Sequence, residues 1–317
     1  MEIGNSTIFH LERSLVGTCR SIHDKLESED KNNVTRLFDP EDGTVIAKPP
    51  RDEEGFWVGC PSIIYEQGCF YLYYRVRGKR RGSKGILAES SDGINFEQIK
   101  EFDKTDLGAT SIEGASIRKC GELFELYISY QDKESRRWRI GVTSSPNFQN
   151  LNPSGLEQVF TGSSSHYHIK DPVIDENGFF AHSMSKHYLS SCAVEIEKTT
   201  EERIKIREIS PDTLNVDSFR ITSVMKLDDN LVVFYDYQPS ILHVWEERSG
   251  LATTESFERF KCKENFRCGK GTGSLRYVNA ARHKDEVFLY YETSTEEGGH
   301  ELRMNNLAVE DLQKYVS

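Results

Sequence analysis

Residues 59–74 have the sequence GCPSIIYEQGCFYLYY, the first copy of a pattern that recurs along the chain. A start that contains proline leads into a short apolar segment, a Gln-Gly turn follows, and a run of aromatic residues ends the stretch. Short runs of β-branched and aromatic residues around a turn favour two strands rather than a helix. We therefore predict a β-hairpin here.

The same plan recurs four more times along the chain. The five copies align at Pro61, Ala115, Pro172, Thr222 and Ser274, with separations of 54, 57, 50 and 52 residues. An aromatic second strand is expected at residues 70–74, 123–130, 179–183, 231–237 and 287–291, and a third strand at 85–89, 138–143, 192–195 and 301–305. Such a period is typical of a propeller, in which one repeat cannot bury its own apolar face but a ring can. We predict an all-β fold, a five-bladed β-propeller.

The repeats lie within one predicted domain that spans residues 1–317. Residues 1–55 form an N-terminal arm, from which we expect the strand that closes the last blade. The blades occupy residues 56–305, and residues 306–317 form a C-terminal tail. Short peripheral helices are expected at residues 14–26 and 309–315, and a polar loop at 28–33.

Composition excludes several classes of partner. The net charge of −11 argues against nucleic acid, whose binding requires a basic surface. No run approaches the ~18 apolar residues of a membrane span, and the polar N-terminus lacks a signal-peptide core, so we expect a cytoplasmic protein without a membrane partner. Seven cysteines without a Cys-x-x-Cys pair predict reduced thiols rather than disulfides or a zinc ribbon. Composition does not indicate the oligomeric state.

The openings of the repeats resemble those of the five-bladed propeller glycosidases. Residues 71–75 (YLYYR) and 85–93 (GILAESSDG) are similar to the first repeat of glycoside hydrolase family 130. Lys170-Asp171-Pro172 is similar to third-repeat motifs of families 130 and 32, and Glu113-Gly114 resembles the element that carries the general acid in family 43. The resemblance covers roughly residues 55–305. It implies a glycosidase or glycoside phosphorylase that acts on a small glycoside, without a cofactor.

Two positions depart from these families. Cys60 stands where families 43 and 32 have an Asp that acts as base or nucleophile, and Gly114 lies in the tetrad where family 130 has its proposed acid. Two other functions therefore stay open. One is a catalytically silent carbohydrate-binding propeller, and the other is a propeller repurposed for non-hydrolytic small-molecule biosynthesis.

Glu113 and Asp171 are the predicted catalytic pair, because glycoside hydrolysis needs a proton donor and a second carboxylate. A carboxyl recessed near another carboxylate has a raised pKa, so we assign Glu113 as the acid. We expect Asp171 to stay ionised beside Lys170 or an arginine, where it would orient a hydroxyl or stabilise positive charge.

Further residues are predicted to line the substrate site. Alternation places His166 and His168 on one strand face, suited to a proton shuttle, a hydroxyl contact or a metal, although no third ligand is evident and no metal is predicted. Cys60 is either a nucleophile or a small buried residue. Arginines 75 and 276 fit a phosphate or carboxylate clamp. The acids at strand ends, Asp236 and Glu292, complete the predicted lining.

Overall fold

The structure is a computed structural model, and it describes residues 37–79, 81–187, 191–198, 204–209, 218–238, 247–266 and 268–317. Strands dominate this part of the chain, which confirms the all-β prediction. The helix expected at 309–315 is present as α2 (Val309–Val316). The helix expected at 14–26 and the loop at 28–33 lie outside the described residues. No helix in the described ranges is long and apolar enough to cross a membrane.

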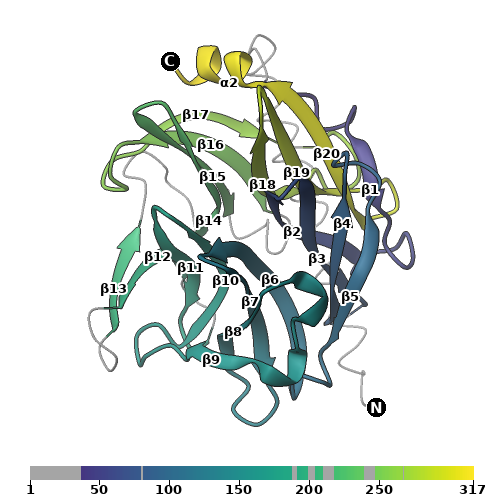
Figure 1. Cartoon of the computed structure of the whole chain (residues 1–317), viewed down its shortest axis with the longest axis vertical. Helices are drawn as coiled ribbons and strands as arrows, with labels where there is room; N and C mark the ends of the chain where they lie inside the picture. The colour runs from purple at the N-terminus through teal and green to yellow at the C-terminus, as the bar shows by residue number, and fades with distance from the viewer. Residues whose placement is uncertain are drawn as a thin grey trace, which may run out of the picture.

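The strands form five successive antiparallel units that surround a common centre (Figure 1). The first unit contains β2 (Trp57–Glu66), β3 (Cys69–Arg77), β4 (Gly82–Ser90) and β5 (Glu97–Asp103). The second contains β6 (Ala109–Cys120), β7 (Leu123–Asp132), β8 (Trp138–Ser145) and β9 (Glu157–Phe160), with short 3-10 turns η1 (Phe148–Asn150) and η2 (Pro153–Gly155) before β9. The third contains β10 (His168–Asp175), β11 (Gly178–Met184), β12 (Ser191–Lys198) and β13 (Ile204–Ile209).

The last two units follow the same order. The fourth contains β14 (Ser218–Leu227), β15 (Asn230–Gln238), β16 (Arg248–Thr254) and β17 (Lys261–Phe266). The fifth contains β18 (Leu275–His283), β19 (Glu286–Ser294) and β20 (His300–Ala308), and its fourth strand is β1 (Thr44–Ala47), which pairs antiparallel with β20. Segments near both ends of the chain therefore build one unit.

The predicted hairpin at 59–74 is β2 and β3. Gln67 and Gly68 join these strands and have φ values of 53° and 86°. Two successive positive φ angles match a type I′ turn, whose twist suits a tight hairpin. Glycine tolerates this conformation without steric cost, which explains the Gln-Gly pair in the sequence.

Five apolar clusters join the units into a cycle. Each cluster contains buried residues from two neighbouring units, so together they connect units 1 to 2, 2 to 3, 3 to 4, 4 to 5 and 5 to 1. In the last of these, Tyr290 of unit 5 packs in the same cluster as Leu72 of unit 1. Burial between units, rather than within them, therefore supplies the core.

Hydrogen bonds from side chain to backbone also join neighbouring inner strands. The four pairs are Ser62 Oγ with Ile117 N at 3.0 Å, Ser116 Oγ with Ile174 N at 3.0 Å, Ser223 Oγ with Ala280 N at 3.1 Å, and Asn279 Oδ1 with Ile63 N at 3.0 Å. In each pair the backbone N–H donates. The corresponding residue of unit 3 is Val173, which has no acceptor in its side chain.

The expected opening of the fifth repeat was misplaced. Ser274 precedes β18, whereas the irregular pairing that marks an opening lies at Tyr277 and Val278. Thr222 of unit 4 donates to Val278 O at 2.8 Å, so Val278 is its neighbour across the interface. The Gly-Thr-Gly sequence at residues 271–273 resembles the start of the other repeats, but it lies in the turn before β18. The repeat pattern also missed β16 and the four outer strands β5, β9, β13 and β17.

Candidate functional site

The inner strands share an irregularity of pairing a few residues after they begin, and the residues at these irregular positions lie close together. In four units two residues of the inner strand face one residue of the next strand. These pairs are Cys60-Pro61, Glu113-Gly114, Asp171-Pro172 and Tyr277-Val278. Cys60, Asp171 and Tyr277 have φ values of 53°, 51° and 58°, a left-handed conformation that costs a non-glycine residue about 1–2 kcal/mol. Strained positions of this kind cluster at functional sites.

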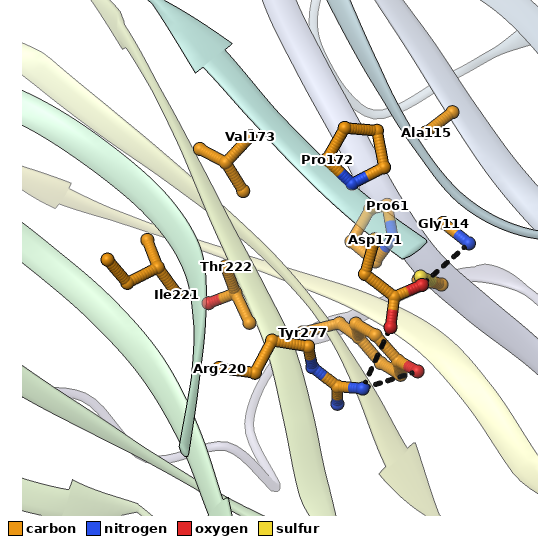
Figure 2. A pocket seen from close by; sticks show the side chains of 11 residues that line it. Pro61, Gly114, Ala115, Asp171, Pro172, Val173, Arg220, Ile221, Thr222 and Tyr277 are labelled. Carbon is orange, nitrogen blue, oxygen red and sulfur yellow. Dashed lines mark hydrogen bonds and ion pairs between the residues drawn. The ribbon is translucent and has the colours of Figure 1, made fainter. Parts of the chain in front are cut away.

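A small cavity lies among these openings (Figure 2). Its lining includes the Cys60, Asp171 and Tyr277 side chains together with Arg220. Its volume of about 20 Å³ holds roughly one water molecule and is too small for a sugar ring. A sugar therefore cannot occupy this cavity without a rearrangement.

Gly114 is required by the close approach of two side chains. A Cβ atom there would lie 2.8 Å from Cys60 Sγ and 2.9 Å from Asp171 Oδ1. The Gly114 N–H donates to the same Asp171 oxygen at 3.1 Å. The departure from the family pattern at Gly114 thus has a packing reason, since no acidic side chain fits.

Asp171 is held as a carboxylate. Arg220 Nη1 lies 3.0 Å and Lys170 Nζ 3.1 Å from its Oδ2, as Figure 2 shows for the arginine. Burial alone would raise the pKa of Asp171, but Lys170 and Arg220 bring it well below its usual range. This agrees with the prediction that Asp171 stays ionised beside a cation.

Glu113 is also held as a carboxylate, which contradicts its predicted raised pKa. Its Oε2 accepts a hydrogen bond from Arg75, and Arg77 Nη1 lies 3.6 Å from its Oε1. Burial would raise the pKa of Glu113, but Arg75, Lys170 and Arg77 lower it below its ordinary value. The sequence placed Glu113 near a carboxylate but did not indicate that cations would surround it.

Glu113 and Asp171 belong to a larger alternating network of charges. Glu292 Oε2 lies 2.8 Å from Arg75 Nη2, and Glu292 Oε1 lies 2.6 Å from Arg276 Nη2. Arg276 Nη1 in turn lies 2.7 Å from Glu247 Oε2. Burial would raise the pKa of Glu247, but Arg276 and Arg220 lower it to about 2.

The network accounts for the two arginines that were predicted to bind a phosphate or carboxylate. Arg75 and Arg276 do lie near each other, but both bind Glu292, and its carboxylate lies between the two guanidinium groups. A carboxylate already occupies the position that a phosphate would take.

Asp236 differs from the other carboxyls of the network. Its Oδ2 lies 2.6 Å from Arg220 Nη2, and its Oδ1 accepts hydrogen bonds from Ser249 at 2.6 Å and from the Tyr277 N–H at 2.9 Å. Burial raises the pKa of Asp236 to about 6, although Arg220 and Ser249 oppose this shift. Asp236 is therefore the member of this network closest to taking up a proton near neutral pH.

The two predicted histidines do not share a site. His168 accepts a hydrogen bond from the Trp138 N–H through Nδ1 at 3.2 Å, beside the central network. His166 Nδ1 instead lies 2.9 Å from Ser183 Oγ, and its Nε2 lies 3.8 Å from Glu208 Oε1. The turn before β10 breaks the alternation that was expected to align them.

Cys60 is buried, with 3% of its surface exposed. Burial and the charge of Asp171 raise the pKa of its thiol well above the ordinary value. A neutral thiol is a poor nucleophile, so the geometry favours the alternative of a small buried residue. None of the six cysteines in the described ranges forms a disulfide.

Four residues of the site were missed from the sequence: Arg220, Glu247, Tyr277 and His182. Arg220 begins an opening that the repeat pattern had already identified, so its position alone could have revealed it. Tyr277 was hidden by the misplaced fifth opening, and Glu247 precedes the missed strand β16. Nothing in the sequence marks His182.

Comparison with known proteins identifies the class of fold. No family model and no curated protein sequence matches this chain. Among solved structures, the chain is similar to the GH43_1 enzyme from Xanthomonas citri complexed with xylose, with a TM-score of 0.59, 13% identity, and coverage of 84% of this chain and 90% of that one. CoXyl43, a β-xylosidase/α-arabinofuranosidase from a compost metagenome, matches with a TM-score of 0.59 and 12% identity over 84% of this chain and 94% of that one. RS223-β-xylosidase matches with a TM-score of 0.58 and 10% identity over 82% of this chain and 95% of that one.

The chain therefore has the fold of family 43 glycoside hydrolases. At this level of identity the likeness concerns the fold alone. The resemblance to families 130 and 32 stays a prediction.

Proposed function

We propose that the five units are the blades of one closed five-bladed propeller. The cycle of five apolar clusters and the pairing of β1 with β20 support this proposal. The family 43 neighbours support it further through their shared fold. The openings of the inner strands would then lie along a central channel.

We further propose that the chain binds a small neutral sugar or related polyol at the end of this channel and does not hydrolyse glycosides. The observation that carries this proposal is that Glu113 and Asp171 both form ion pairs with cationic side chains. Each carboxylate lies against two cations, and each has a lowered pKa. Neither can supply a proton at neutral pH, and Cys60 and Gly114 supply no replacement.

The balance of charge favours a neutral ligand. Five carboxylates, at positions 113, 171, 236, 247 and 292, lie among five cationic side chains, at positions 75, 77, 170, 220 and 276. An anion such as phosphate would compete with carboxylates already bound, which disfavours phosphorolysis. Among structural neighbours, xylose and xylotriose are the ligands named.

His182 provides a specific contact for a hydroxyl group. It is 5% exposed, and neither ring nitrogen has a hydrogen-bond partner among the described residues. Burial and the charges of Arg220 and Lys170 lower the pKa of His182 to about 3, so the ring is neutral, with one donor and one acceptor. A hydroxyl both donates and accepts, as a neutral imidazole does. Lys170 and Glu247 remain 14% and 16% exposed, so solvent reaches this end of the site.

Hydrolysis is a second candidate because of one observation, the pKa of about 6 at Asp236. Asp236 and the ionised Asp171 bind the same guanidinium, that of Arg220. A protonatable carboxyl beside an ionised one is the pairing that glycosidases use. Asp236 is 1% exposed, however, so this reaction would require the site to open.

Two measurements on the same protein test the proposal. Calorimetric titration with xylose, xylotriose and other neutral sugars should give saturable binding, and chromatography should detect no product from a panel of aryl glycosides. His182→Ala should weaken binding at least tenfold, whereas His187→Ala, at an exposed position five residues later, should not. Product release that Asp236→Asn abolishes would favour hydrolysis, and absence of sugar binding by the wild type would contradict the proposal.

A further inference from the structure

A second group of reactive side chains lies in the third unit, apart from the central network. It consists of His166 from the turn before β10, Cys192 on β12 and Glu208 on β13. Each residue offers one ligand atom, and these three atoms lie within 4.8 Å of one another. Imidazole nitrogen, thiolate sulfur and carboxylate oxygen are the protein ligands of zinc.

The pairing of the strands explains how Cys192 and Glu208 meet. Cys192 lies two residues before Val194 on β12, so both side chains project from one face. Glu208 is opposite Val194 on the neighbouring strand. Cys192 and Glu208 are therefore diagonal neighbours on a rigid antiparallel pair, within reach of a common ion.

Ser183 positions the third ligand. It lies opposite Cys192 on β11, and its Oγ is 2.9 Å from His166 Nδ1. A proton on Nδ1, donated to Ser183, leaves a lone pair on Nε2, which lies 3.8 Å from Glu208 Oε1. Metal-binding histidines commonly carry such an outer hydrogen bond, which fixes both the ring and its tautomer.

The ligand set selects the metal. Zinc bonds of about 2.0–2.3 Å place tetrahedral ligand atoms roughly 3.3–3.8 Å apart. The His166–Glu208 separation of 3.8 Å is a few tenths of an ångström longer than the roughly 3.3–3.5 Å that a nitrogen and an oxygen ligand require. The Glu208 side chain is 66% exposed, so it can move to complete the approach to Cys192. Sulfur and nitrogen ligands disfavour calcium and magnesium, which prefer oxygen.

We propose that His166, Cys192 and Glu208 bind Zn²⁺ through Nε2, Sγ and one carboxylate oxygen, with a fourth position open to water. The Cys192 thiol releases its proton to solvent as the Zn–S bond forms. The bound ion would tie the turn before β10 to β12 and β13 of the same unit, and so fix the segment that leads to Lys170 and Asp171.

Titration of the full chain with metal tests this site. After treatment with a chelator and its removal, calorimetry with Zn²⁺ should show one site per chain, and Co²⁺ should give a thiolate charge-transfer band with tetrahedral visible absorption. Cys192→Ser should abolish the charge-transfer band, and both Cys192→Ser and Glu208→Gln should weaken Zn²⁺ binding at least tenfold. Circular dichroism of each metal-free variant checks that it is folded.

Cys120→Ser is the matched control, because Cys120 is an exposed cysteine outside the cluster and could bind metal adventitiously. This variant should bind Zn²⁺ as the wild type does. The proposal is overturned if the wild type shows no binding, if folded Cys192→Ser and Glu208→Gln bind as tightly as the wild type, or if Cys120→Ser removes the cobalt band.

Discussion

Asn279 of the last unit accepts a hydrogen bond from the backbone N–H of Ile63 in the first unit, at 3.0 Å. The same side chain donates through Nδ2 to Thr222 O of the fourth unit, at 2.8 Å. One amide group therefore links three units at the point where the beginning and the end of the repeat array meet.

Replacement of Asn279 should weaken this junction. Asn279→Ala leaves a backbone donor and a backbone acceptor without their partner, at about 1–3 kcal/mol for each group that stays buried. We expect urea denaturation to show a loss of about 2–4 kcal/mol of unfolding free energy. Asn306→Ala, which removes an exposed contact with Glu286, should cost little. If Asn279→Ala and Asn306→Ala lower the unfolding free energy equally, the hydrogen bonds of Asn279 do not stabilise the contact between the units.

Glu247 should make stability depend on pH in the acid range. Its pKa falls from an ordinary 4.5 to about 2 in the folded state, so the unfolded chain takes up its proton first. Its contribution, about 3 kcal/mol, is present above pH 4.5 and disappears as the pH falls toward 2. The stability difference between wild type and Glu247→Gln should shrink over this interval in denaturant titrations. A difference that is constant from pH 6 to pH 2.5 would contradict this assignment.

Asp236 should make the folded protein more stable as the pH falls, whereas Glu247 makes it less stable, and its effect should begin at a higher pH. Its pKa is raised from 3.8 to about 6 in the folded state, so the folded protein takes up this proton before the unfolded chain does. Relative to Asp236→Asn, the wild type should gain about 3 kcal/mol as the pH falls from 7 to 3. Denaturation of both proteins at several pH values measures this gain, and parallel curves would show that the pKa of Asp236 is not raised.

The Cys60 thiol should be unreactive in the folded protein. Burial and the nearby Asp171 raise its pKa, so little thiolate exists at neutral pH. Mass spectrometry after brief treatment with iodoacetamide should find the exposed Cys120 labelled and Cys60 unlabelled until denaturant is added. If Cys60 is labelled faster than Cys120, Cys60 is reactive and could act as a nucleophile.

The repeated hairpins could be predicted because they depend on local patterns. Apolar and aromatic runs around turns identified the second strand of every unit, the first strand of the first four units, and most third strands. The outer strands were missed because they are short and largely polar, as in β5 with the sequence EQIKEFD. Their position is set by pairing with β4 rather than by their own composition.

The candidate site was predictable in position but not in protonation state. Glu113 and Asp171 lie near each other in the structure because the inner strands of neighbouring repeats bring equivalent positions together, and Arg75 of the adjoining unit contacts Glu113. The pKa of Glu113 depends on two arginines of a neighbouring unit, and the sequence does not reveal how such side chains orient. Contacts between units therefore decide the chemistry.

The unfolding free energy of Glu113→Gln shows whether the Glu113 carboxylate is an ionised structural partner of Arg75 and Arg77. Removing the charge of Glu113 leaves buried Arg75 with Glu292 alone and takes from Arg77 its carboxylate partner, so we expect a loss of about 3–5 kcal/mol. Glu125→Gln, which breaks the partly exposed pair with Arg118, should cost under about 1 kcal/mol. A Glu113→Gln protein as stable as the wild type, with loss of a measurable glycosidase activity, would instead identify Glu113 as a catalytic acid.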